Sequence, residues 1–142
     1  IIVQGCVGIQ TDNKNFKNYV LIKFWRSPEV SESSKGELTL EAGHQLLETI
    51  IRCWSPHLAT WTTTTWLRAV PKREAYTPSL GWKTYFSEPA VCELISDLGK
   101  PLYQGILLET SSDIHDVTPE KIVALAQELS NRGVESVLYC GT

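Results

Sequence analysis

Apolar and polar stretches alternate in the first part of the chain and predict a hairpin followed by a loop. Residues 1–10 and 19–25 are rich in β-branched and aromatic residues, and the turn-forming stretch TDNKN lies between them. This pattern predicts two paired strands. Residues 26–37 contain Pro, Gly and four Ser, a composition that is typical of a loop.

A helical pattern follows the loop. Apolar residues recur at helical spacing from Leu40 to Trp54, and Thr39 is suitably placed to cap the first turn. Ser55–Pro56 should end the helix, because a proline disfavours helical geometry in the residue before it. Gly43 would weaken the helix by up to about 1 kcal/mol relative to alanine.

The second half of the chain mixes predicted strands with helices. Residues 58–66, LATWTTTTW, favour a strand because they are rich in Thr and Trp, although this strand could turn into a short helix through TWLRAV. GWKTYF (residues 81–86) and YQGILLET (103–110) predict further strands. Residues 88–99 between them predict a helix, and ESVLYC (135–140) predicts a last strand.

The clearest local signal lies near the end of the chain. Thr118 is a natural N-cap, Pro119 suits the first helical position, and Glu120 falls in the first turn. Gly133 marks the C-terminal stop. Between these two signals, the predicted helix has one apolar face that includes Ile122, Leu125, Ala126 and Leu129.

Together these elements predict an α+β fold: a mainly antiparallel sheet with helices packed on one side. Residues 1–142 suit a single domain, which at this length buries roughly two-thirds of its unfolded surface. The chain contains no Met, even at position 1, so we expect its native N-terminus to be missing. Neither a long apolar run nor a secretory signal is visible, so we expect a cytoplasmic protein without a membrane partner.

Charge is distributed unevenly along the chain. The net charge is −3, and residues 88–142 hold nine Asp or Glu against three Lys or Arg. Beyond Lys72–Arg73 there is no basic cluster, which argues against nucleic-acid binding. An acidic flank of this kind attracts basic protein surfaces, but charge alone favours an ordinary solvated acidic face.

The cysteines do not predict a metal or redox site. No pair has the C-x-x-C spacing, and we expect buried free thiols rather than the two disulfides that an even count permits. Acidic Glu88 and Glu93 flank Cys92, a setting that disfavours a reactive thiolate. The four residues are Cys6, Cys53, Cys92 and Cys140.

One stretch, SSDIHD, is the best candidate for catalytic chemistry. Together with Glu109, its residues Asp113, His115 and Asp116 could hold a divalent metal, and Ser111 could complete a triad with His115 and Asp116. Asp and Ser also commonly end a strand and precede a helix cap. Phosphate-binding loops, nucleophile elbows and metalloprotease motifs are all missing, so we expect neither enzymatic activity nor a cofactor.

Tryptophans provide the remaining candidates. Trp61 and Trp66 are five residues apart, so on one strand they would occupy opposite faces, and one of them would be a candidate interface anchor. Trp82 would share a strand face with Phe86, which favours a place in the core over a place in an active site. Gly81 before it would permit a bend or close packing beside the indole.

Several short motifs, in order, resemble the immunity protein 52 family of bacterial polymorphic toxin systems. The shared pattern is a helix running into a W-x-P turn, a Thr-rich stretch, a G-W-x-T-Y strand and a late helix. The match covers roughly residues 45–131, and it departs from the family pattern at Ser55 and His57, where acidic residues often stand. The matching positions are Trp54 to Pro56, Thr60 to Thr65, Gly81 to Tyr85, and Asp113 or Asp116 leading into Pro119, Ile122 or Val123, and Ala126.

This resemblance implies an α+β fold without enzymatic activity. It also implies binding to a cognate toxin encoded next door, often a nuclease of restriction-endonuclease fold. The residues expected to contact that toxin are Asp113, Asp116, Glu109, His115, Trp61 and Trp66, and those expected to be structural are Gly81, Trp82, Tyr85, Trp54 and Pro56. Two alternatives stay open: a small metal-dependent hydrolase using residues 109–116, and a non-catalytic adaptor domain.

Overall fold

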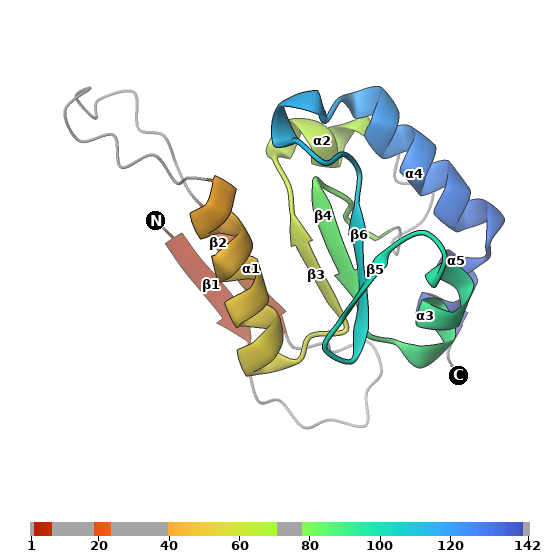
Figure 1. Ribbon diagram of the computed structural model, residues 1–142, viewed down its shortest axis with the longest axis horizontal. Coiled ribbons are helices and arrows are strands. Elements are labelled where there is room, and N and C mark those ends of the chain that lie inside the picture. Colours follow the sequence, from red (N-terminus) through yellow and green to blue (C-terminus); the bar gives the residue numbers. More distant parts are fainter. Residues whose placement is uncertain (1, 7–18, 24–39, 71–77, 141–142) are drawn as a thin grey trace. The chain divides into compact units, whose positions relative to one another are not determined.

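The computed structural model describes residues 2–6, 19–23, 40–70 and 78–140 (Figure 1). The chain forms two compact units, Ile1–Thr39 and Leu40–Thr142, and each is described by itself. The predicted loop at residues 26–37 lies outside the described part. The single domain expected from the length of the chain therefore remains a prediction.

The first unit contains one antiparallel pair of strands. β1 (Ile2–Cys6) pairs with β2 (Tyr19–Lys23) in a register that places Ile2 opposite Lys23 and Cys6 opposite Tyr19. The strand pairing predicted from the β-branched and aromatic composition is confirmed.

The second unit is built on a four-stranded sheet in which every pair is antiparallel. The strand order is β3-β4-β6-β5, with Leu58 opposite Phe86 and Thr84 opposite Leu108. The α+β class and the antiparallel sheet are thus confirmed. The elements of this unit in chain order are α1 (Leu40–Trp54), β3 (Leu58–Trp61), α2 (Thr64–Ala69), β4 (Lys83–Phe86), α3 (Pro89–Ile95), β5 (Lys100–Leu102), β6 (Gly105–Glu109), a 3₁₀ helix η2 (Ile114–Asp116), α4 (Pro119–Asn131) and α5 (Val134–Cys140).

Helices cover both faces of this sheet, which corrects the expectation that they pack on one side (Figure 1). On one face, Trp82 and Phe86 pack against buried residues of α3, α4 and α5. On the other, Tyr85 lies in a second core with Leu47 and Ile51 of α1. The reason is that β4 is buried along its whole length, so both of its faces need an apolar cover.

Most helix boundaries follow the local signals in the sequence. The Thr118 hydroxyl accepts a hydrogen bond from the Lys121 N–H at 3.4 Å, so the predicted N-cap of α4 is confirmed. Gly133 adopts φ 76° after the end of α4, where a glycine is favoured. Within the Thr-rich stretch, Thr63 caps α2, and the expected change from strand to short helix is confirmed.

The last element differs from its prediction. ESVLYC belongs to helix α5 and not to a strand. Its β-branched and aromatic residues favour a strand locally, but Val134, Val137 and Leu138 are spaced to place one helical face on the core. Val134 is fully buried there, so tertiary packing overrides the local propensity.

Gly43 has a packing role within α1. A Cβ at this position would lie 2.6 Å from the Trp61 ring, closer than carbon atoms approach in proteins. The glycine therefore allows the helix to rest directly on the indole. This contact offsets the intrinsic cost of a glycine inside a helix.

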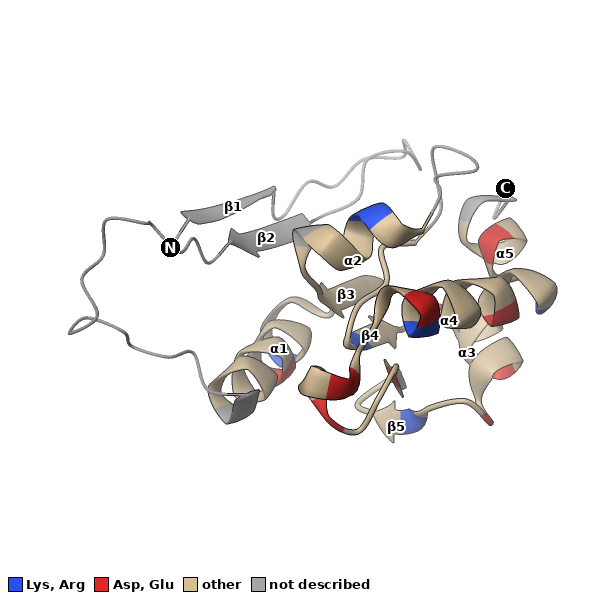
Figure 2. Cartoon of the chain, turned by 90° about the horizontal axis from the view of Figure 1, so that it is seen from above, with Lys and Arg blue, Asp and Glu red and all other residues tan. Residues whose placement is uncertain are grey.

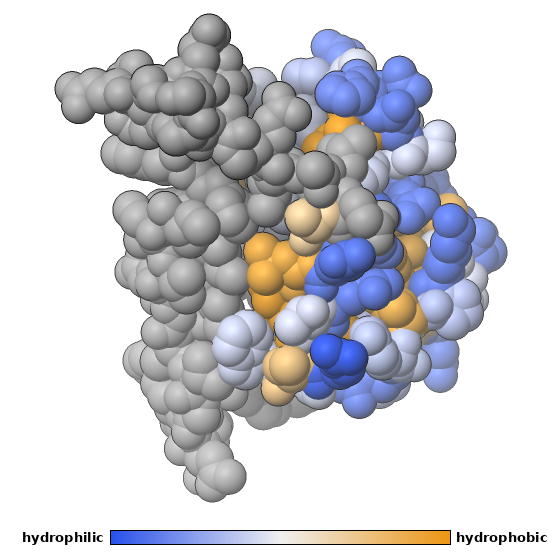
Figure 3. Space-filling model, turned by 60° about the vertical axis from the view of Figure 1, so that its left-hand side comes forward, coloured by the Kyte–Doolittle hydropathy of each residue, from blue (hydrophilic) through white to orange (hydrophobic). Residues whose placement is uncertain are grey.

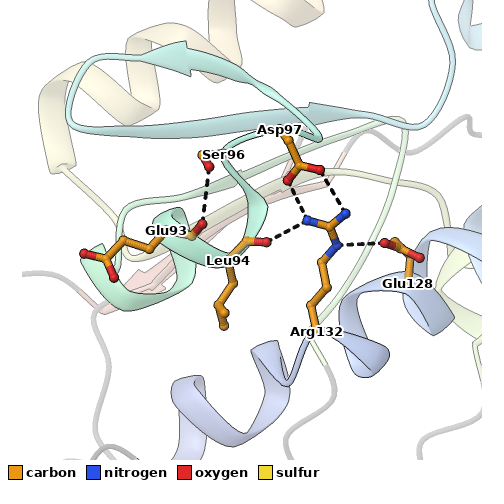
Figure 4. A network of polar contacts seen from close by, with 6 residues as sticks. All are labelled: Glu93, Leu94, Ser96, Asp97, Glu128 and Arg132. Carbon is orange, nitrogen blue, oxygen red and sulfur yellow. Dashed lines mark hydrogen bonds and ion pairs between the residues drawn. The ribbon is translucent and has the colours of Figure 1, made fainter.

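Arg132 joins the C-terminal ends of α3 and α4 (Figure 4). Its guanidinium donates to both carboxylate oxygens of Asp97, at 2.5 and 3.0 Å, and to Glu128 at 2.7 Å. It also donates to the Leu94 carbonyl at 2.9 Å, which satisfies an acceptor in the last turn of α3. Hydrogen bonding to Arg132 lowers the pKa of Asp97.

Candidate functional site

Side-chain hydrogen bonds from threonines hold residues 79–81, the segment that leads into β4. Three threonine hydroxyls donate to three consecutive carbonyl oxygens: Thr60 to Ser79 at 2.7 Å, Thr62 to Leu80 at 2.9 Å, and Thr110 to Gly81 at 2.6 Å. These bonds give the threonines a structural role, because they fix residues 79–81, which belong to no strand, at the start of β4.

Gly81 and Trp82 lie in the interior of this arrangement. A Cβ on Gly81 would stand 2.0 Å from the Trp61 carbonyl oxygen, so only glycine fits there. Trp82 is 6% exposed, and its indole N–H donates to the Ser111 carbonyl at 2.9 Å. The pair therefore anchors the entrance of β4 to the segment that follows β6.

Tyr85 is also part of the interior. Its side chain is fully buried, and its ring lies against Gly105, where a Cβ would come within 2.7 Å of Cζ. Burial raises the pKa of the Tyr85 hydroxyl, and the Cys92 thiol raises it further.

The turn after α1 is more exposed than its motif suggests. Trp54 keeps 45% of its surface exposed, and Ser55 adopts φ 43°. Pro56 is half-buried, and its carbonyl accepts a hydrogen bond from the Ser87 hydroxyl at 3.0 Å. The turn thus connects α1 to the end of β4, while the indole of Trp54 remains at the surface.

Trp61 and Trp66 do not share a strand, which corrects the geometry expected for them. Trp61 is the last residue of β3, whereas Trp66 lies in α2. Both are half-buried and pack against the core, so neither projects freely from the surface. Their expected contact with a toxin remains a prediction.

Lys83 is a buried cation held by several groups. Its side chain is 9% exposed, and its ammonium lies 3.1 Å from a carboxylate oxygen of Glu109 and 3.0 Å from Nδ1 of His44. The ammonium also stands 4.6 Å from the centroid of the Trp82 ring, within range of a cation–π interaction. His44 extends the network to Glu48, with Nε2 at 3.1 Å from Oε1. These contacts connect α1 to the sheet.

Glu109, one of the expected toxin contacts, is neutralised inside the protein. It pairs with Lys83 and, at 3.2 Å, with Lys100, and its side chain is 25% exposed. Burial by itself would raise the pKa of Glu109, but hydrogen bonds and charge from the two lysines outweigh burial and lower it. The carboxylate is therefore largely committed to holding β4, β5 and β6 together.

Asp113, His115 and Asp116 have a different setting. All three are exposed, and the Asp113 carboxylate accepts a hydrogen bond from the His115 N–H at 2.8 Å, which caps η2. Glu120 follows in the first turn of α4 and is exposed as well. We call Asp113, Asp116 and Glu120 the acidic segment. Figure 2 shows acidic residues on this connection between β6 and α4, and on α3, α4 and α5.

Among the residues that the structure describes, no ion pair involves any of the three carboxylates of the acidic segment. Hydrogen bonding to its own backbone and to Thr118 lowers the pKa of Glu120. The segment therefore presents negative charge to its surroundings.

The side chains of SSDIHD (residues 111–116) do not form the metal site or the triad that their sequence allowed. Within the described ranges, no group of three or more His, Cys, Asp or Glu side chains is placed to hold a metal ion. No hydrogen bond joins the side chains of Ser111, His115 and Asp116, and the Ser111 carbonyl is occupied by Trp82. The sequence proximity of these residues therefore does not become a metal site or a triad in this structure.

Two cysteines can be placed, and both are free thiols. Cys92 is half-buried, and burial raises its pKa, which fits an inert thiol. Cys53 is exposed, which corrects the expectation of burial; it lies on α1 away from Leu47 and Ile51, the helix's buried residues. The side chains of Cys6 and Cys140 lie outside the described part.

Exposed apolar residues are the feature that sequence reasoning missed. They are scattered over α1, α2, α4 and the β5–β6 turn, and the described surface in Figure 3 shows apolar patches between hydrophilic areas. Tyr103 is 58% exposed and adopts φ 51° in a two-residue turn, where Gly, Asn or Asp is usual. Its sequence, YQ, carries no turn signal. The exposed side chains are Trp54, Leu67, Tyr103 and Val123.

None of the described helices is long and apolar enough to cross a membrane. Comparison with known proteins adds no assignment: no family model, no curated protein and no solved structure matches this chain.

Proposed function

We propose that this chain is an immunity protein that binds and neutralises a cognate antibacterial toxin in the cytoplasm, and that the toxin is a nuclease. The observation that carries the proposal is the acidic segment, an exposed connection whose carboxylates have no cationic partner in the described part of the chain. The motif resemblance supports the class of protein, and the charge pattern supports the kind of partner.

Internal pairing separates the acidic segment from Asp97, Glu109 and Glu128, although Glu93 and Glu135 also form no ion pair with another described residue. Arg132 neutralises Asp97 and Glu128, while Lys83 and Lys100 neutralise Glu109. These pairs hold elements of the fold together, so their charge is partly used within the molecule. The carboxylates of the acidic segment remain available to an external cation.

The acidic segment is also held in place by the fold. Before it, the Ser111 carbonyl is fixed by the Trp82 indole, and within it Val117 is buried in the main core. Asp113 is fixed further as the cap of η2. A connection that is ordered before binding loses less conformational entropy when a partner docks, so its carboxylates suit specific recognition.

A nuclease is the class of toxin that fits such a surface. It must hold a phosphodiester backbone, so its cleft should carry Lys and Arg. Carboxylates at the positions of phosphates would occupy this cleft, and complementary charge would speed the encounter. We propose that Asp113 and Asp116 face the toxin directly.

The test is protection in cells that co-express the chain with the toxin encoded beside its gene. The wild-type chain should restore growth, and the double variant Asp113→Asn, Asp116→Asn should protect less. Asparagine retains an oxygen that can cap η2, so the substitution removes charge while preserving the local hydrogen bond.

A matched control removes the same charge elsewhere. Glu93→Gln with Glu135→Gln alters α3 and α5, and neither residue forms an ion pair with another described residue. This control should protect as well as the wild type. Failure of the wild-type chain to protect would reject the immunity function, whereas equal protection by both double variants would reject only the acidic segment as the docking site.

A further inference from the structure

We draw no further inference here: the strongest candidate, the end of the sheet where the exposed side chains of Trp54 and Tyr103 stand at turns with positive φ, is an unpartnered surface, and nothing in the described part of the chain shows what covers it.

Discussion

Replacing Trp82 with alanine should destabilise the protein strongly. The indole is 6% exposed and packs in the core that joins β4 to α3, α4 and α5. Emptying a large aromatic site of this kind costs about 3–5 kcal/mol, because apolar burial is lost and the cavity collapses only in part. That loss is a large fraction of the 5–15 kcal/mol by which domains are typically stable.

Trp82→Phe separates the hydrogen bond from the packing. Phenylalanine keeps much of the apolar ring but cannot donate to the Ser111 carbonyl. Loss of one such bond costs about 1 kcal/mol, and the smaller ring adds to this cost. The phenylalanine variant should therefore fall between the wild type and the alanine variant.

Trp54→Ala is the matched control, because it removes the same side chain from an exposed position. Trp54 is 45% exposed at the end of α1, so its loss should cost clearly less than the loss of Trp82. Both tryptophans belong to the motifs that resemble the family. The comparison therefore tests whether the loss of stability depends on burial of the side chain or on its place in a motif.

The assay is urea unfolding followed by far-UV circular dichroism, which does not depend on the tryptophan that each variant removes. The midpoints of Trp54→Ala and Trp82→Phe should both lie between those of the wild type and Trp82→Ala, with an unchanged slope. An alanine variant at position 82 that unfolds within about 1 kcal/mol of the wild type would refute the packing argument.

Three further predictions concern charge, backbone packing and chemistry. Because the folded protein lowers the pKa of Glu109, its contribution to stability is present above the unfolded pKa of about 4.3 and is lost as the pH falls through the lower folded value. Urea titrations of wild type and Glu109→Gln should therefore converge in acid; a constant difference would contradict this linkage. Gly81→Ala should cost about 1–3 kcal/mol, because its Cβ would collide with the Trp61 carbonyl, and an unchanged melting temperature would contradict that geometry. The purified protein should hydrolyse neither esters, peptides nor phosphodiesters with added divalent metals; turnover that Asp113→Ala or His115→Ala abolishes would favour the hydrolase alternative.

Elements with strong local signals could be predicted from the sequence. The Thr118 cap, Pro119 and Gly133 define α4 because each satisfies a backbone requirement within a few residues. The α+β class followed from the alternation of such segments. An element could be predicted from the sequence where nearby residues alone determine its backbone conformation.

Elements that depend on distant contacts could not be predicted in the same way. The helix α5 is chosen by packing of Val134 into the core, against the strand propensity of its residues. The edge strand β5 contains Pro101 and only three residues, so it has almost no periodicity to detect. Its pairing with β6 becomes visible only in the fold.

The candidate site could be predicted only in part for the same reason. The exposure of Asp113 and Asp116 agrees with their turn-forming sequence. The commitment of Glu109 to Lys83 could not be read from the sequence, because the two residues are brought together by the register of β4 with β6. Counting acidic residues along the chain therefore overestimates how many carboxylates are free to contact a partner.

The most direct test of the central claim is the rate at which the chain associates with the neighbouring toxin at low and at moderate salt. The account predicts that association of the wild type slows as salt rises. The variant Asp113→Asn, Asp116→Asn should associate more slowly with a shallower salt dependence, while Glu93→Gln, Glu135→Gln should behave like the wild type. Identical rates and salt dependences for the wild type and the Asp113, Asp116 variant would contradict the account, because the acidic segment would then contribute nothing to the encounter.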